Sequence, residues 1–301
     1  MRPIRLIELF SGVGAQSSAL DRLGLKYENW ITSEWDINAV ASYRAIHCEN
    51  DTEDYSQDIP IDEIINTLIK WQVSVNGKSP LTKDQIIHKS EKWQREVYSN
   101  FIATRNIGSV TTATAADLAI CNTDKYTYML TYSFPCQDLS VAGAQKGMSK
   151  NSGTRSGLLW EVERLLRECE ELPHILVMEN VPQVHGKKFR GDFDKWCDVL
   201  KELGYHNYWN DLNSKDYGVA QNRNRTFMVS FLKDRRFEWP EPIPLTKTMR
   251  DYLDDDVDDK YYIDNEKAQK LIDQLILDGR IPTQAQTPVD FTTNSPRERD
   301  C

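Results

Sequence analysis

The sequence predicts an α/β fold in which a mostly parallel sheet carries helices on both faces. Three observations support this class. Apolar runs of strand length recur along the chain, amphipathic stretches separate them, and a glycine-bearing turn follows the first run. Polar side chains stand directly after several of these runs, where open α/β sheets place their ligands. We therefore expect a functional site at the carboxyl edge of the sheet.

The composition is that of a soluble globular protein. The 301 residues are 40% hydrophobic and 28% charged, and no apolar run approaches the ~18 residues of a membrane span. The run 4–10 is too short and too acidic for a signal peptide. Six cysteines lack CxxC or metal-ligand spacing, which indicates a reduced, cytoplasmic setting without a metal. The net charge of -9 argues against non-specific coating of nucleic acid, although a local basic face would suffice for a DNA enzyme.

The N-terminal residues predict a strand, a turn and a helix. Ile4 to Phe10 is an apolar run, Ser11 to Gln16 is a glycine-bearing turn, and Ser17 to Leu25 has helical spacing with Gly24 as its stop. Glycines let the backbone approach a ligand closely, and a helix start favours an anionic group. This is the front half of a nucleotide-binding βαβ unit, so the expected fold is Rossmann-like.

The next strand, Tyr27 to Ser33, ends at a carboxylate beside an aromatic ring. Glu34 lies about twenty residues past Gly14, where such folds hold ribose hydroxyls, and Trp35 offers a flat face for adenine. The third glycine of the dinucleotide fingerprint is missing, which argues against NAD and FAD as ligands. Adenosyl ligands without a pyrophosphate, such as S-adenosyl-L-methionine, remain. The alternative is an ordinary βα turn with a core tryptophan.

A helical insertion is expected from about 59 to 105. Apolar residues recur at helical spacing from Ile61 to Ile69, and a second amphipathic stretch covers 84–101. We find no catalytic constellation in this segment. Its aromatic residues Trp71, Trp93 and Tyr98 are interpreted as core rather than as ligand platforms.

The central motif is a cysteine after a buried strand. Tyr128 to Phe134 is followed by Pro135, Cys136 and Gln137. A helix N-terminus nearby would lower the pKa of the Cys136 thiol and favour the nucleophilic thiolate. The alternative is a small buried thiol. The polar stretch 145–151 suits a mobile loop over a site, and the next helix is expected over 158–169.

A second carboxylate and two arginines follow further strands. The strand 173–178 ends at Glu179, which is either at the ligand edge or a cap on the next turn. A helix over 192–203 and a strand over 205–213 precede Arg223 and Arg225, which enter the strand 226–232. We expect these arginines to share one face and grip an anion or a base edge. A solvated basic rim is the alternative.

Together these stretches resemble the bacterial and phage DNA (cytosine-5)-methyltransferase family, over roughly residues 5–232. Five short motifs occur in the family's order with plausible spacing, which makes the resemblance specific. The similar segments are Phe10-Ser-Gly-Val-Gly14 with Glu34-Trp35, Phe134-Pro-Cys-Gln137 with Ser140, Thr154-Arg-Ser-Gly-Leu158, Glu179-Asn-Val181, and Gln221-x-Arg223-x-Arg225.

The resemblance implies a DNA (cytosine-5-)-methyltransferase. Its cofactor would be S-adenosyl-L-methionine, with S-adenosyl-L-homocysteine as product and no metal, and its substrate cytosine C5 in duplex DNA. A flipped base and a covalent adduct of Cys136 with C6 would carry the reaction. The implied residues are Cys136, Glu179, Arg223 and Arg225 for catalysis; Phe10, Gly12, Gly14, Glu34, Trp35, Pro135 and Leu158 for the cofactor; and Gln137, Ser140 and Asn180 for the substrate.

The chain departs from the family pattern in two places. Where the family has an acidic adenine contact, Ser109 aligns and Asp117 is a rival, so that contact stays unassigned. The segment 241–301 is acidic, carries one helix over 265–277, and resembles no recognition domain. We expect a catalytic domain over 1–240, followed by the start of a longer recognition region or a segment completed by a second chain.

Two other functions fit the same residues. The first is a tRNA cytosine-5 methyltransferase of the same family, because that branch reads a folded RNA without the missing domain. The second is an inactive or partner-dependent subunit that binds the cofactor or DNA. The leading interpretation is a bacterial or phage modification enzyme, with or without a cognate restriction endonuclease.

Overall fold

The computed structural model describes residues 2–139, 147–150, 152–254, 256–258, 260 and 265–280. Two compact units are present. Of the described residues, the first unit comprises those in 2–211 and 225–238, and the second comprises those in 212–224 and 239–280. Among the described helices, none combines the length and apolarity that a bilayer crossing requires.

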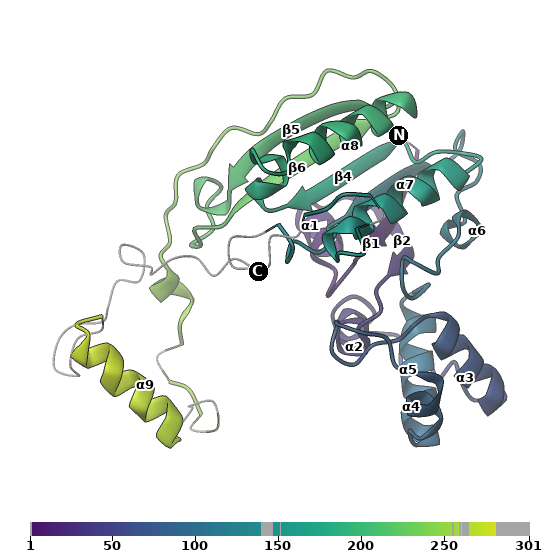
Figure 1. Cartoon of the computed structure of the whole chain (residues 1–301), viewed down its shortest axis with the longest axis horizontal. Helices are drawn as coiled ribbons and strands as arrows, with labels where there is room; N and C mark the ends of the chain where they lie inside the picture. Colours follow the sequence, from purple (N-terminus) through teal and green to yellow (C-terminus); the bar gives the residue numbers. More distant parts are fainter. Residues whose placement is uncertain are drawn as a thin grey trace. The chain divides into compact units, whose positions relative to one another are not determined.

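A six-stranded sheet forms the centre of the first unit (Figure 1). The strand order is β2-β1-β3-β4-β6-β5. Strands β2, β1, β3 and β4 run parallel, and β6 is antiparallel to β4. This confirms the predicted α/β class with a mostly parallel sheet. The strands are β1 (Ile4–Leu9), β2 (Tyr27–Ser33), β3 (Thr127–Tyr132), β4 (Ile175–Asn180), β5 (His206–Asn213) and β6 (Asn224–Phe231).

Helices connect the strands and extend the unit. Those of the first unit are α1 (Ala15–Arg22), α2 (Ile37–His47), α3 (Ile61–Lys70), α4 (Lys83–Ile87), α5 (Glu91–Ala103), α6 (Ala115–Leu118), α7 (Leu159–Glu168) and α8 (Arg190–Glu202). Short 3₁₀ turns, η1 (Ser156–Leu158) and η2 (Pro182–His185), precede α7 and follow β4. The helix expected over 158–169 therefore begins with a tighter turn.

The side chains of β1 show how the two faces of the sheet are covered. Ile7 and Leu9 belong to the main apolar cluster, which also contains residues of α7 and α8. Both helices lie over one face in Figure 1. Glu8 points the other way and accepts hydrogen bonds from Ser17 of α1 and Tyr43 of α2. Because successive strand residues alternate in direction, the sheet carries helices on both faces, as predicted.

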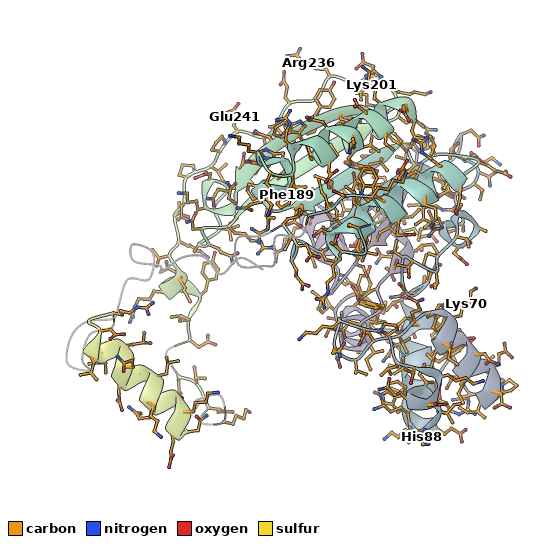
Figure 2. The ribbon with its side chains drawn as sticks, in the orientation of Figure 1. Lys70, His88, Phe189, Lys201, Arg236 and Glu241 are labelled. Atoms are coloured by element: carbon orange, nitrogen blue, oxygen red, sulfur yellow. The ribbon has the colours of Figure 1, made fainter. Side chains whose placement is uncertain are left out.

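The predicted helical insertion forms a small bundle with its own core. Helices α3, α4 and α5 pack through a second apolar cluster that includes Ile64, Ile86 and Phe101, all with 0% exposure. Figure 2 labels Lys70 at the end of the bundle nearer the sheet and His88 at the far end. The chain that leaves α3 therefore returns toward the sheet.

Glu8 is a buried carboxyl, and it gives the fold a pH dependence. Glu8 is 1% exposed, and burial raises the pKa of its carboxyl although Ser17 and Tyr43 donate hydrogen bonds to it. The folded state therefore holds this proton to a higher pH than the unfolded chain does. The contribution of Glu8 to stability is largest below the unfolded pKa of about 4.3 and falls as pH rises toward the folded pKa.

We expect the Glu8→Gln variant to lose less folding stability than the wild type as the pH rises. Wild-type stability relative to Glu8→Gln should decrease as the pH rises from about 4 to 7, measured by urea unfolding at each pH. Glu49→Gln, at an exposed position, reports the general effect of removing one charge. A stability difference for Glu8→Gln that does not change with pH would exclude this carboxyl as the titrating group.

The second unit has little buried surface. It contains η3 (Ser214–Asp216), η4 (Met249–Tyr252) and α9 (Glu266–Leu277), and a single bridge pairs Tyr217 with Ile243. The helix expected over 265–277 is thus present. None of the described residues after Ser230 is buried, and Leu277 is 80% exposed.

Candidate active site

A cavity of about 290 Å³ opens at the carboxyl edge of the sheet. Residues that follow the ends of three neighbouring strands line it: Phe10 after β1, Glu34 and Trp35 after β2, and Ser133 and Pro135 after β3. The parallel strands bring these ends to one edge, which is where open α/β sheets bind ligands. The volume lies near the lower end of the ~300–1,000 Å³ typical of small-molecule pockets.

The Glu34 carboxylate is held by backbone N–H groups at the mouth of the first βα turn. Its Oε2 accepts from the Gly12 N–H at 3.1 Å, and its Oε1 accepts from the N–H groups of Trp35 and Asp36, each at 2.9 Å. Burial raises the pKa of Glu34, and these three donors oppose that rise. A carboxylate offers about four lone-pair positions, so one remains for a ligand hydroxyl.

The glycines of the first turn shape the backbone behind the cavity. Gly14 is the N-cap residue of α1 and has φ +84°, and a Cβ there would lie 2.3 Å from the His47 ring. Gly12 has φ +53° and donates to Glu34. Neither glycine is among the described residues that line the cavity, whereas Phe10 is. The two glycines therefore allow the turn to pack closely, and they do not themselves line the cavity.

Three side-chain contacts anchor the loop that carries Cys136. The buried Asn180 amide donates to the Phe134 carbonyl at 2.9 Å, and the buried Ser156 hydroxyl donates to the Pro135 carbonyl at 2.6 Å. Asp138 accepts from the Arg155 N–H at 2.8 Å. Cys136 is therefore preceded by two carbonyls that are fixed by different elements.

Cys136 itself is half-buried and packs against the main apolar cluster. The residues on both sides of it, Pro135 and Gln137, line the cavity together with Leu158. The Gln137 side chain accepts a hydrogen bond from the Arg155 guanidinium. The predicted residue Ser140 lies outside the described residues, as do residues 145, 146 and 151 of the stretch 145–151 that suits a mobile loop.

Glu179 and Arg225 form an ion pair across two strands. Arg225 Nε lies 3.1 Å from Glu179 Oε1, and their side chains are 5% and 23% exposed. The strand β4 extends through Glu179 and Asn180, two residues further than expected, because both pair with the antiparallel β6. The position of Arg225 on β6 thus orients its side chain toward Glu179 on the neighbouring β4, and the Glu179 carboxylate remains partly exposed to solvent.

The two arginines that were expected to share a face fall in different units, Arg225 in the first and Arg223 in the second. Strand β6 begins at Asn224, so Arg223 lies before it and alternation along the strand does not fix its direction. Arg223 is exposed and belongs to the second unit, where its N–H donates to the Asn213 side chain at 3.1 Å.

The cavity is also lined by one of the two residues considered for the unassigned contact and by two residues that the sequence did not single out. Ser109, one of the two candidates for the unassigned contact, lines the cavity. Asp117 instead caps α6 by accepting from the Thr114 N–H and hydroxyl. Gln72 and Lys78, in the insertion, also line the cavity. A contact between segments distant in sequence brings Gln72 and Lys78 to the cavity, and no local sequence pattern predicts that contact.

Comparisons with known proteins agree on one family. The sequence model of the family described as "C-5 cytosine-specific DNA methylase" matches residues 4–69 and 82–280. The chain is 36% identical over 267 residues to "Orphan methyltransferase M.SssI" of Spiroplasma monobiae, covering 88% of this chain and 68% of that protein. It is 34% identical over 271 residues to "Type II methyltransferase M2.ScrFI" of Lactococcus lactis subsp. cremoris, covering 88% and 71%.

Two solved structures share the fold. The S. pombe Dnmt2 methyltransferase aligns with a TM-score of 0.55 and 16% identity, covering 91% of this chain and 66% of that one. A putative DNA modification methyltransferase from an E. coli prophage aligns with a TM-score of 0.52 and 19% identity, covering 87% and 58%. The chain therefore spans between 58% and 71% of the length of these four proteins.

Proposed function

The chain belongs to the C-5 cytosine-specific DNA methylase family, and on that premise we propose that it transfers a methyl group to C5 of cytosine in duplex DNA. The observation that carries the proposal is one edge of the sheet, where the cysteine loop contributes to a cofactor-sized cavity and the neighbouring strand β4 ends in a carboxylate–arginine pair. The class is DNA (cytosine-5-)-methyltransferase, with S-adenosyl-L-methionine as the cofactor.

The residues of the cavity fit this cofactor. Phe10 and Trp35 supply aromatic surface for an adenine ring, and Leu158 supplies apolar surface. The free lone-pair position of Glu34 suits a ribose hydroxyl. Gly12 and Gly14 would act indirectly, by letting the turn pack closely around Glu34. The bound cofactor supplies an electrophilic methyl group on sulfur.

Cys136 is the proposed nucleophile. Cytosine C5 is a weak nucleophile, so its direct methylation is slow. Bond formation between the Cys136 thiolate and C6 moves electron density to C5, which can then take the methyl group. Loss of the C5 proton to a base and expulsion of the thiolate restore the aromatic ring. The base must leave the duplex stack to reach this site.

The carboxylate–arginine pair is proposed to hold the flipped base. Glu179 would bind N3 and the exocyclic amine and stabilise the charge that develops there. Arg225 orients Glu179 and would reach the base O2. Arg223 would support the thiolate electrostatically. Gln137 and Ser140 would contact the substrate, whereas Asn180 would act through the loop whose Phe134 carbonyl it holds.

We also propose that residues 1–240 form the catalytic domain and that 241–301 are a separate acidic segment. A cognate endonuclease or a second chain would be a partner of the whole enzyme.

The reaction is tested by transfer of labelled methyl from S-adenosyl-L-methionine to mixed-sequence duplex DNA and, in parallel, to bulk tRNA. Label in DNA alone supports the proposal. Label in tRNA alone would show that the substrate is tRNA and not DNA. Label in neither nucleic acid would contradict the proposal that this chain is active by itself.

Glu34 provides a test of the cofactor site. We expect Glu34→Gln to weaken S-adenosyl-L-homocysteine binding by about 10- to 100-fold, because a hydrogen bond to a charged group contributes about 1.5–3 kcal/mol. Calorimetry measures the affinity, and DNA binding should not change. The matched control is Asp36→Asn, since Asp36 caps α2 and asparagine caps equally well. Unchanged cofactor affinity in Glu34→Gln would remove Glu34 from the site.

A further inference from the structure

Gln72 occupies a backbone position that normally belongs to glycine. Helix α3 ends at Lys70, and Gln72 follows with φ +53°. The Gln72 N–H donates to the Ile69 carbonyl at 3.0 Å, and the Val73 N–H donates to the Leu68 carbonyl at 3.3 Å. Helices often end in this way, with glycine in the left-handed position because it has no Cβ. A glutamine is strained there, and strained residues gather at functional sites.

The Gln72 side chain ends a directional chain of hydrogen bonds in the cavity. The Thr111 hydroxyl donates to Gln72 Oε1 at 3.0 Å. Thr111 has one hydroxyl proton, so the Ser109 hydroxyl is the donor in their 2.8 Å contact. Ser109 Oγ in turn accepts from the Thr111 N–H at 3.3 Å. All three residues line the cavity, and the order of donors fixes Gln72 Oε1 as an acceptor.

Backbone contacts hold this chain of side chains rigidly. The Ser109 N–H donates to the Trp71 carbonyl at 2.9 Å, and the Ser33 hydroxyl donates to the Gly108 carbonyl at 2.7 Å. A Cβ at Gly108 would lie 2.5 Å from the Trp71 Cβ, so the two loops touch without room for a side chain. The end of α3 and the loop 108–111 therefore form one wall.

This wall stands at the end of the cavity away from Cys136. Residues 105–107 pair with β2 on its outer side, through bonds between the backbone of Thr32 and those of Arg105 and Ile107. Cys136 follows β3, and β1 separates β3 from β2 in the sheet. A cofactor whose methyl group faces Cys136 extends its other end, the adenine ring, toward Gln72.

We propose that Gln72 determines the specificity of the cavity for the adenine ring of the cofactor. This inference rests on the proposed function. A primary amide presents an acceptor beside a donor, which matches the amine and the adjacent ring nitrogen of adenine. Gln72 Oε1 has a second lone pair for the amine, and its Nε2 donates to the ring nitrogen. A 6-oxo purine would place its carbonyl oxygen against Gln72 Oε1 and is disfavoured.

The test compares two probes by calorimetry, S-adenosyl-L-homocysteine and S-inosyl-L-homocysteine. We expect the wild type to prefer the adenosyl probe at least tenfold, and Gln72→Gly to lose about tenfold in adenosyl affinity and most of that preference. Its melting temperature should stay the same or rise, because glycine suits the left-handed position. A purely structural role for Gln72 would instead lower the melting temperature.

The matched control is Ala119→Gly, since Ala119 has φ +50° and is not among the described lining residues. This variant should keep both affinities. Adenosyl binding by the wild type with unchanged affinities in Gln72→Gly would overturn this inference alone. A Gln72→Gly variant that unfolds would also overturn it. A wild type that binds neither probe would overturn the proposed function, and this inference with it.

Discussion

Cys136→Ala is expected to reduce methyl transfer to below about 1% of wild type, because the covalent route to an activated C5 is lost. Binding of S-adenosyl-L-homocysteine should stay within about twofold, since the lining side chains that are proposed to contact the cofactor remain in place. Transfer of labelled methyl to duplex DNA and calorimetry measure the two quantities. Residual transfer well above that level would assign the nucleophile to another group.

The other cysteines make this prediction specific. Burial raises the pKa of the Cys169 and Cys197 thiols to about 11, so at neutral pH they are almost entirely protonated. Cys121 is exposed and lies before β3, on the side of the sheet where that strand begins. Cys121→Ala is therefore the matched control, and it should transfer methyl groups at the wild-type rate.

Glu179→Gln is expected to lower transfer by about 10²- to 10³-fold, the loss typical of removing one group that stabilises charge in a transition state. It also leaves Arg225 buried without its carboxylate, and breaking such a pair destabilises a protein by about 3–5 kcal/mol. The activity loss and the stability loss thus need separate measurements, by transfer assays and by urea unfolding.

A double variant separates the two effects. In Glu179→Gln with Arg225→Met neither charge is left without its partner, so the free energy of unfolding should recover toward that of the wild type. Transfer should remain as low as in Glu179→Gln. Recovery of transfer together with stability would show that the pair supports the fold and not the chemistry.

Local sequence patterns predicted most of the sheet and the residues that follow its strands. Phe10, Glu34, Trp35 and Pro135 all line one cavity, because each follows a parallel strand and such ends share an edge. The boundaries of β4 were less predictable. Its last two residues are fixed by pairing with β6, which is distant in sequence.

The missed part of the cavity comes from contacts between distant loops. A helical pattern precedes Gln72 in the sequence, and no motif surrounds it. The sequence therefore predicted only that Gln72 belongs to a helical insertion without a functional site. Its position depends on the contact between Trp71 and Gly108, which no local period reveals. The left-handed backbone of Gln72 is visible only in the structure.

The most direct test of the central claim is trapping with duplex DNA that contains 5-fluorocytosine. Fluorine at C5 cannot leave as a proton does, so the adduct between the thiolate and C6 persists after methyl transfer. With S-adenosyl-L-methionine present, mass spectrometry of the digested protein should find the methylated base on the peptide that contains Cys136, and no adduct in Cys136→Ala. Methylation of ordinary DNA with no trapped adduct, or an adduct on another cysteine, would contradict the assignment.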